Sequence, residues 1–150
     1  MLEVDVVRIS VIVPIYNVKL YIERCVRSLM EQTLENIEFI FVNDCTPDDS
    51  MDILHYVLEE YPKRREQIKI IEHETNRGIS AVRNTGLKNA TGQYIIYCDS
   101  DDWVEKNMYE KLLVKALETS ADIVGCDFFD DYVAHSTIRK QLFPQQSEKC

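Results

Sequence analysis

The sequence lacks any apolar run that approaches the roughly 20 residues needed to span a bilayer. It begins without the basic region and small-residue cleavage site of a signal peptide, and it contains no internal repeat or low-complexity tract. What it does contain is 150 residues, of which 45% are hydrophobic and 29% charged. This composition is typical of a globular protein, and the length predicts one domain with a sizeable core.

Cysteine pairs at metal-binding spacing are also absent. The five cysteines are odd in number and contain no C-x-x-C pair, which argues against a zinc site and against a disulfide framework. The three histidines, His55, His73 and His135, are isolated from one another, so we expect structural or solvent-exposed roles for them. A reduced, cytoplasmic compartment is the simplest expectation.

Positive charge is scarce. The chain has 17 lysines and arginines against 26 aspartates and glutamates, a formal net charge of −9. This balance argues against nucleic acid as a partner, because phosphate backbones require a basic surface. Residues 99–131 alone hold ten acids and three lysines, a net of −7. If this acidic chain handles phosphates, a bound cation is a natural source of the missing positive charge.

Strand-like and helical patterns alternate along the chain. Continuous β-branched runs are typical of strands buried on both faces, whereas apolar spacings of three and four residues predict amphipathic helices. The predicted strands are residues 9–13, 37–42, 68–71, 93–98 and 123–126, and the predicted helices are residues 18–32, 48–61, 80–90 and 106–119. We expect Pro14 to end the first strand. The alternation predicts an α/β fold, a mostly parallel sheet flanked by helices.

Polar residues gather just after three of these strands. Tyr16 and Asn17 follow the first strand, Asp44 follows the second, and residues 99–102 follow the fourth. Parallel sheets bind ligands beyond the carboxyl ends of their strands. We therefore expect a functional site at this edge of the sheet.

The densest polar motif is acidic. Asp99, Asp101 and Asp102 lie within four residues and repel one another unless a cation or hydrogen-bond donors absorb their charge. Mg²⁺ and Mn²⁺ are commonly held by one or two carboxylates together with substrate phosphates. The alternative interpretation is a solvated loop in which Asp102 caps the next helix.

Two arginines flank a glycine-containing turn that leads into a helix. Arg77 precedes Gly78, and Arg83 lies six residues after Arg77. Guanidinium groups and helix N-termini suit phosphate, although both arginines could equally pack on the surface. The basic residues 63–65 are interpreted as a solvated loop.

Tyr16 and Asp44 could form a slot for a nucleobase. A tyrosine face can stack on a ring, and a carboxylate accepts an imino N–H. The alternatives are a half-buried packing role for Tyr16 and turn chemistry for Asp44.

These motifs resemble those of the nucleotide-sugar glycosyltransferases of family 2, which have the GT-A fold. The matching stretches are residues 11–17, 28–33, 41–50, 76–87 and 97–103, in family order and spacing. The resemblance implies that Tyr16 and Asp44 contact uracil and ribose, and that Asp99 contacts the donor ribose or sugar. It also implies that Asp101, with Asp102 beside it, binds Mn²⁺ or Mg²⁺. The implied donor-site residues are Pro14, Tyr16, Asn17, Asp44, Gly78, Arg83, Asp99 and Ser100.

The sequence departs from the family pattern after the second strand. Asn43-Asp44-Cys45-Thr46 replaces the commoner Asp-Asp-Gly-Ser. Cys45 therefore stands where a glycine would be free to adopt positive φ.

The resemblance further implies inverting transfer of a sugar from a nucleoside-diphosphate donor, with uridine favoured, to an acceptor hydroxyl. The general base is expected beyond the acidic motif, yet only 49 residues follow Asp101. We therefore expect the chain to carry the donor-binding half of a longer enzyme, with its catalytic base elsewhere. The expected organisation is an N-terminal extension (1–7), a nucleotide-sugar-binding domain (8–135) and a polar tail (136–150).

Two alternatives remain open. A metal-dependent phosphohydrolase would place its acidic motif after the first strand rather than the fourth, which disfavours it. A non-catalytic nucleotide- and metal-binding module is compatible with the short chain. If transfer is the function, the expected acceptor is a saccharide or a lipid-linked sugar, with association at the inner face of a membrane through a region outside this chain.

Overall fold

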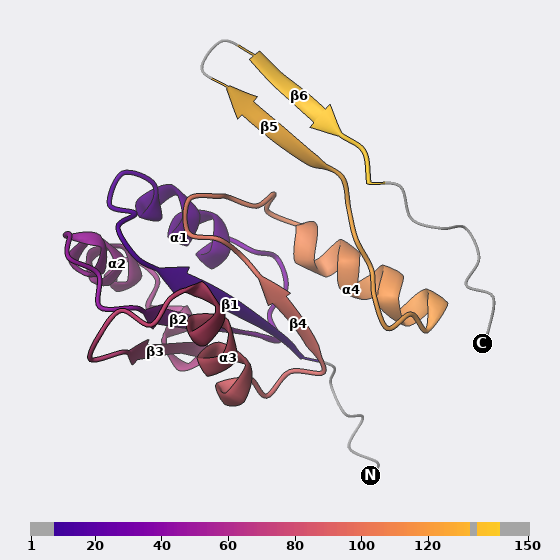
Figure 1. Ribbon diagram of the computed structural model, residues 1–150. Helices are drawn as coiled ribbons and strands as arrows, with labels where there is room; N and C mark the ends of the chain where they lie inside the picture. The colour runs from indigo at the N-terminus through magenta and orange to yellow at the C-terminus, as the bar shows by residue number, and fades with distance from the viewer. Residues whose placement is uncertain (1–7, 133–134, 142–150) are drawn as a thin grey trace. The chain divides into compact units, whose positions relative to one another are not determined.

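A computed structural model describes residues 8–132 and 135–141, so the expected N-terminal extension lies outside the described residues. Its main feature is a parallel sheet of four strands in the order β3-β2-β1-β4 (Figure 1). The strands are β1 (Ile9–Ile15), β2 (Ile37–Asn43), β3 (Ile68–Glu72) and β4 (Tyr94–Tyr97). All four were predicted, and the parallel α/β arrangement is confirmed.

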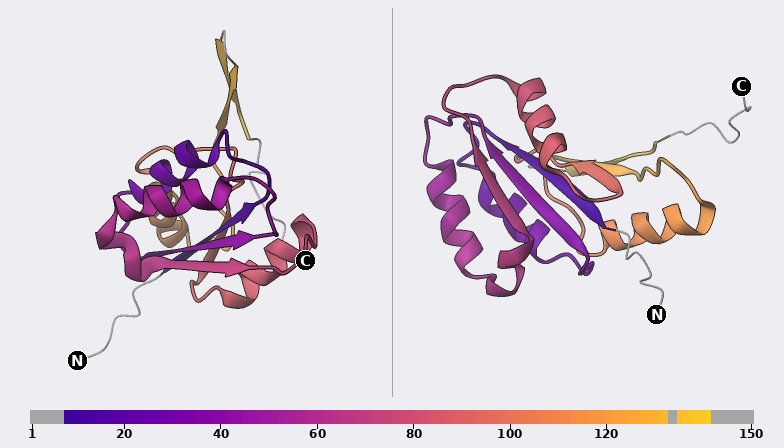
Figure 2. Two further views of the ribbon diagram at one scale, coloured as in Figure 1. Left: turned by 90° about the vertical axis from the view of Figure 1, so that its left-hand side faces the viewer. Right: turned by 90° about the horizontal axis from the view of Figure 1, so that it is seen from below.

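Helices cover both faces of this sheet. Helices α1 (Ile22–Met30) and α2 (Ser50–Glu59) lie on one face, and α3 (Ile79–Asn89) lies on the other (Figure 2). A 3₁₀ helix, η1 (Pro62–Gln67), joins α2 to β3. Every residue of β1 and β2 is buried, as expected for central strands covered on both sides.

Helix α3 packs directly against the sheet. Its Val82 joins Ile12, Ile40 and Val42 in one buried cluster. The approach is closest at Gly86, where an added Cβ would lie 2.3 Å from Cγ2 of Ile12. This close packing fixes the position of α3, whose N-terminal end lines the pocket described below.

Pro14 lies inside β1 rather than ending it, which corrects the prediction. Its partner in the register is Val42 of β2. The carbonyl of Ile12 accepts a hydrogen bond from the N–H of Cys98, so the backbone groups of Ile12 point toward β4. Backbone groups alternate in direction along a strand, so those of Pro14 point toward the β4 side as well. The paired residues of β4 end at Tyr97 opposite Ile12. The missing N–H of Pro14 therefore faces beyond the end of β4 and breaks no ladder bond.

A buried carboxylate anchors the opposite, amino-terminal end of the sheet. Glu38 of β2 is 2% exposed and accepts hydrogen bonds from Ser10 and from the backbone and hydroxyl of Thr91, while Lys69 lies 3.1 Å away. Burial alone would raise the pKa of Glu38, but these donors outweigh it and lower the pKa to about 2. The carboxylate thus ties the turn before β4 to the two central strands.

The chain divides into two compact units, Met1–Glu110 and Lys111–Cys150. Helix α4 (Met108–Thr119) spans the division, and the second unit contains the antiparallel pair β5 (Phe128–Tyr132) and β6 (His135–Arg139). The strand predicted at 123–126 is wrong: these residues are irregular, and Ile123 is 83% exposed.

Residues 136–139 of the segment expected as a polar tail belong to β6. An ion pair between Arg139 and Asp130 and a hydrogen bond from Ser136 to Asp131 join β6 to β5. The rest of the expected tail, from residue 142, lies outside the described residues. Among the helices that the structure describes, none is long and apolar enough to cross a membrane.

Candidate functional site

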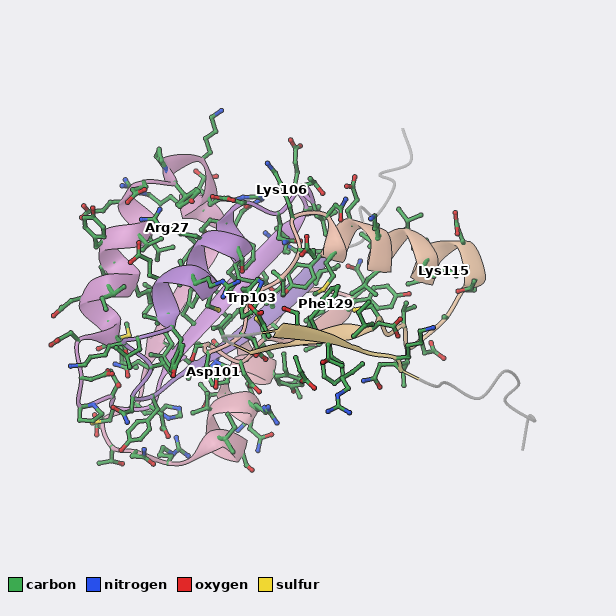
Figure 3. The ribbon with its side chains drawn as sticks, turned by 90° about the horizontal axis from the view of Figure 1, so that it is seen from above. Arg27, Asp101, Trp103, Lys106, Lys115 and Phe129 are labelled. Atoms are coloured by element: carbon green, nitrogen blue, oxygen red, sulfur yellow. The ribbon has the colours of Figure 1, made fainter. Side chains whose placement is uncertain are left out.

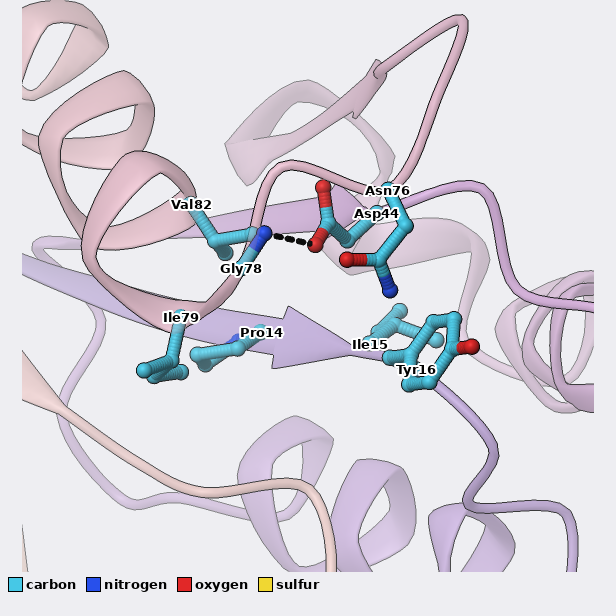
Figure 4. Close-up of a pocket in the computed structure, with 8 residues that line it drawn as sticks. All are labelled: Pro14, Ile15, Tyr16, Asp44, Asn76, Gly78, Ile79 and Val82. Carbon is cyan, nitrogen blue, oxygen red and sulfur yellow. Dashed lines mark hydrogen bonds between the residues drawn. The ribbon is translucent and has the colours of Figure 1, made fainter.

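A pocket of about 150 Å³ opens at the carboxyl ends of β1 and β2 (Figure 4). Tyr16 forms one side of it and the start of α3 another, with Asp44 and Asn76 between them. The lining residues are Pro14, Ile15, Tyr16, Asp44, Asn76, Gly78, Ile79 and Val82. The apolar side chains together with one carboxylate and one carboxamide suit a small planar ring with polar edges.

Asp44 is the buried anion of this pocket. Its Oδ1 accepts hydrogen bonds from Nδ1 of His73 (2.7 Å) and the backbone N–H of Arg77 (2.9 Å), and its Oδ2 accepts from the N–H of Gly78 (2.8 Å). Burial alone would raise the pKa of Asp44, but these three donors lower it below its ordinary value. The pocket therefore presents an ionised hydrogen-bond acceptor.

The loop that carries Tyr16 is fixed by the loop after β2. Three consecutive backbone N–H groups, those of residues 17–19, donate to Thr46 Oγ1 (2.8 Å), Ser50 Oγ (3.1 Å) and Asp48 Oδ2 (3.0 Å), respectively. Asp48 in turn accepts from Thr46 and Ser50. Burial raises the pKa of Asp48, yet these donors outweigh it and bring the pKa to about 2. The turn residues 46–50 thus position the tyrosine face of the pocket.

Two turn residues adopt left-handed backbone conformations. Asn17 has φ 54° and Cys45 has φ 58°. Asparagine tolerates this region, whereas cysteine carries the full steric penalty of its Cβ. Cys45 therefore adopts the positive φ that a glycine would reach without strain, although the sequence departs from the family pattern here.

The acidic motif forms a turn after β4, closed by a hydrogen bond from the N–H of Asp102 to the carbonyl of Asp99. Asp101 and Asp102 are exposed, whereas Ser100 is buried. Partial desolvation of the carboxyl group, followed by repulsion from Asp101 and Asp99, raises the pKa of Asp102. Negative charge is thus incompletely compensated here, which fits a cation.

No three His, Cys, Asp or Glu side chains are grouped at metal-binding distance within the described part of the chain. Protein carboxylates in this turn could therefore supply one or two ligands, as is common for Mg²⁺ sites completed by phosphate and water. Figure 3 labels Asp101 and Trp103 of this turn. The guanidinium of Arg24, on α1, stacks 3.2 Å over the ring of Trp103 and adds a cation that the sequence did not indicate.

Arg83 reaches the acidic motif from α3. Its Nη2 lies 3.1 Å from Oδ1 of Asp99, and its guanidinium carbon lies 5.3 Å from the ring centre of Tyr97. Both charged side chains are about half exposed. The pair places one positive and one negative group at the edge of the sheet where polyanionic ligands are expected.

The structure brings together only part of the predicted site. Pro14, Tyr16, Asp44 and Gly78 line the pocket, and Arg83 pairs with Asp99. The two remaining donor-site candidates and the two metal candidates are absent from the lining: Asn17, Ser100, Asp101 and Asp102.

Sequence reasoning missed Asn76, Ile79 and His73. His73 directly follows β3, so its place at the carboxyl edge of the sheet was the available signal.

The interpretation of residues 63–65 as a solvated loop needs one change. Arg64 donates to the carbonyls of Met30, Gln32 and Leu34, and it therefore ties η1 to the segment after α1.

A parallel sheet with an anionic pocket at its carboxyl edge is the arrangement found in nucleotide-binding α/β proteins. Comparison with known proteins gives the family: the profile of glycosyl transferase family 2 matches residues 10–149. The chain belongs to this family.

Curated relatives share this assignment. The chain is 45% identical over 140 residues to the uncharacterized glycosyltransferase EpsJ of Bacillus subtilis (strain 168), which covers 93% of this chain and 38% of EpsJ. It is 43% identical to glycosyltransferase GlyA of Streptococcus pneumoniae, covering 81% of this chain and 17% of GlyA. The chain thus spans well under half the length of these relatives.

Solved structures share the fold. TarS of S. aureus in complex with UDP-GlcNAc matches with a TM-score of 0.65 and 32% identity, over 74% of this chain and 31% of that one. The mannosyltransferase PcManGT of Pyrobaculum calidifontis, in complex with GDP-Man and Mn²⁺, matches with a TM-score of 0.64 and 25% identity, over 75% of this chain and 32% of that one. The GT-A-like fold expected from the sequence is confirmed.

Proposed function

We propose that this chain binds the nucleoside-diphosphate part of a sugar donor, a UDP-sugar, and that it works as the donor half of a glycosyltransferase. The buried carboxylate of Asp44 at the end of an apolar pocket with a tyrosine wall carries the proposal. A carboxylate there accepts the imino N–H of uracil, and the face of Tyr16 stacks on the ring. The UDP-GlcNAc complex of TarS supports the choice of uridine.

Arg83 and the acidic turn would receive the rest of the donor. The Arg83–Asp99 pair gives a guanidinium for the diphosphate and a carboxylate for a ribose or sugar hydroxyl. Asn17, Ser100 and the Gly78 turn complete the proposed donor contacts. Buried Ser100 would act through its backbone, since its side chain is nearly inaccessible.

A divalent cation, Mn²⁺ or Mg²⁺, is proposed at Asp101 and Asp102. The two side chains are exposed, and the raised pKa of Asp102 reflects partial desolvation of its carboxyl group and repulsion from Asp101 and Asp99, which a cation would offset. When bound, the ion would neutralise charge on the diphosphate leaving group. The Mn²⁺ complex of PcManGT, a neighbour with the same fold, supports this proposal.

The proposed reaction is an inverting displacement in which an acceptor hydroxyl replaces the nucleoside diphosphate. Such a step needs a general base within hydrogen-bond reach of the acceptor. We propose that this base, and the site for a saccharide or lipid-linked acceptor, belong to the part of the relatives that this chain does not span. Association with the inner face of a membrane would then depend on that part.

A second candidate is a nucleotide-binding module without transfer activity of its own, since the same pocket and acidic turn would serve it. A transfer assay with mixed sugar nucleotides and acceptors should show no turnover by this chain alone, and robust turnover would contradict the proposal that the general base lies outside it.

Calorimetric titration tests the binding shared by both functions. We expect UDP to bind in the presence of Mn²⁺ and to lose about tenfold or more in affinity when EDTA removes the ion. Asp101→Asn should abolish this metal dependence, whereas Asp52→Asn, an exposed carboxylate on α2, should keep it. Absence of metal-dependent binding of any nucleoside diphosphate would contradict the proposal.

A further inference from the structure

Three groups donate hydrogen bonds to the carboxylate of Asp44: the side chain of His73 and the backbone N–H groups of Arg77 and Gly78. His73 follows β3, is 9% exposed, and its backbone N–H donates to the carbonyl of Asn43. Its ring lies between the pocket carboxylate and α3, with Nδ1 2.7 Å from Asp44 Oδ1 and Nε2 2.9 Å from Thr85 Oγ1. The ring thus connects the ends of β2 and β3 to the middle of α3.

The hydrogen-bond pattern places a proton on Nδ1 of His73. An ionised carboxylate only accepts, so Nδ1 must carry the proton that it donates to Asp44. Nε2 pairs with the hydroxyl of Thr85, so both ring nitrogens have a partner. The carboxylate of Asp44 thus orients one ring nitrogen, and the hydroxyl of Thr85 orients the other.

The donors are divided unequally between the two oxygens of Asp44. Oδ1 accepts from His73 and Arg77, whereas Oδ2 accepts from Gly78 among the described residues. Each carboxylate oxygen can accept about two hydrogen bonds. The remaining acceptor capacity therefore lies on Oδ2, the oxygen bonded to the glycine that lines the pocket.

We propose that His73 is a positioning residue for base recognition: by holding Oδ1 of Asp44, it directs Oδ2 into the pocket as an acceptor and makes the pocket select a base with an imino N–H, uracil, over cytosine. Cytosine presents an acceptor at the ring nitrogen where uracil presents a donor, so a fixed carboxylate repels it. The proposal rests on the proposed binding of a nucleoside diphosphate and adds the residue that sets its selectivity.

Removal of the His73 donor should change the preference for uracil over cytosine more than it weakens nucleotide binding as a whole. In His73→Leu, Oδ1 loses its side-chain donor, so the carboxylate can rotate or take up a proton and then donate to cytosine. In His73→Asn, the side-chain amide can donate from nearly the same place as Nδ1. His55→Leu is a control at an exposed histidine of α2.

The experiment measures the affinities of UDP and CDP, with Mn²⁺, for the wild type and these three variants by calorimetry, with circular dichroism as a check of folding. We expect the preference for UDP over CDP to fall about tenfold in His73→Leu, and to remain within about threefold of the wild type in His73→Asn and His55→Leu. An equal loss of UDP and CDP affinity in a folded His73→Leu would assign His73 a merely structural role and overturn the proposal. An unchanged ratio would also overturn it.

A measurement on the unaltered chain covers the case in which His73→Leu does not fold. In ¹⁵N-labelled protein, the proposal predicts that Nδ1 of His73 carries a proton and that UDP shifts the His73 signals more than CDP does. An unprotonated Nδ1, or equal shifts with both nucleotides, would overturn the proposal. Failure of the wild type to bind either nucleotide would instead reject the proposed function itself.

Discussion

Arg83 on α3 and Asp99 after β4 form an ion pair, with Nη2 and Oδ1 3.1 Å apart, across the edge of the sheet that holds the pocket. Because both side chains are about half exposed, the pair contributes at most about 1 kcal/mol to stability. Because the pair lies next to the acidic turn, we expect it to contribute more to ligand affinity than to the free energy of unfolding. Measuring both quantities in one variant therefore separates its two roles.

We predict that Arg83→Gln weakens UDP binding by about tenfold and lowers the free energy of unfolding by less than about 1 kcal/mol. The affinity falls because a charge-assisted contact to phosphate is lost. Calorimetry and urea denaturation measure the two quantities. Arg27→Gln is the matched control, since Arg27 pairs with Glu23 of α1 and with Glu60, which directly follows α2. An equal loss of UDP affinity in both variants would show that Arg83 has no specific role in binding.

The left-handed conformation of Cys45 leads to a second prediction. Because a side chain at φ 58° is strained, Cys45→Gly should raise the free energy of unfolding by about 1 kcal/mol. The exposed thiol contributes little packing that could be lost. Urea denaturation gives the difference, and Cys45→Ala, which keeps the Cβ, should remain close to the wild type. If the two variants are equally stable, the strain at this position is negligible.

The contact of α3 with β1 gives a third prediction. In Gly86→Ala the new methyl group would lie 2.3 Å from Cγ2 of Ile12, so either α3 or the side chain must shift. We expect a loss of roughly 1–3 kcal/mol in the free energy of unfolding, despite the better helix propensity of alanine. Ser80→Ala, at an exposed position of the same helix, should change stability by less than about 0.5 kcal/mol. Equal stability of the two variants would mean that the Gly86 contact relaxes without cost.

The sheet could be predicted because its central strands are rich in β-branched and aromatic residues, a pattern typical of burial on both faces. The same reasoning failed for residues 123–126, which are apolar but irregular in the second unit. Local hydrophobicity does not determine whether a neighbouring strand is available for pairing. The prediction that Pro14 ends β1 was wrong for a related reason. A proline fits inside β1 because the pairing with β4 ends before it, and the sequence of β1 does not contain that information.

The site was partly predictable. Tyr16 and Asp44 could be found because each lies just past a strand end, where the topology places ligands. His73 lies at the same edge, but its meaning depends on contacts with Asp44 and Thr85, which are 29 and 12 residues away in sequence. A single histidine gives no local pattern by which such partners can be identified. Arg24 was missed in the same way, since its stacking partner Trp103 belongs to another element.

Glu38 leads to a prediction about acid stability. Its pKa is about 2 in the folded chain against an ordinary 4.5, so folding favours the ionised form. The resulting stabilisation, on the order of 3 kcal/mol in full, is present above pH 4.5 and is lost as the pH falls toward 2. Other carboxylates with lowered pKa values, such as Asp48, act in the same range, so a comparison of variants is needed to isolate Glu38.

We predict that Glu38→Gln is less stable than the wild type at neutral pH and that the difference narrows by roughly 2 kcal/mol between pH 7 and pH 3. Glutamine keeps the size of the side chain and one acceptor oxygen for Ser10 and Thr91, but it puts a neutral amide in place of the charge opposite Lys69. Urea denaturation at several pH values provides the measurement, with the exposed Glu66→Gln as control. A constant difference across this range would mean that Glu38 stabilises the fold through its shape and packing rather than through its charge.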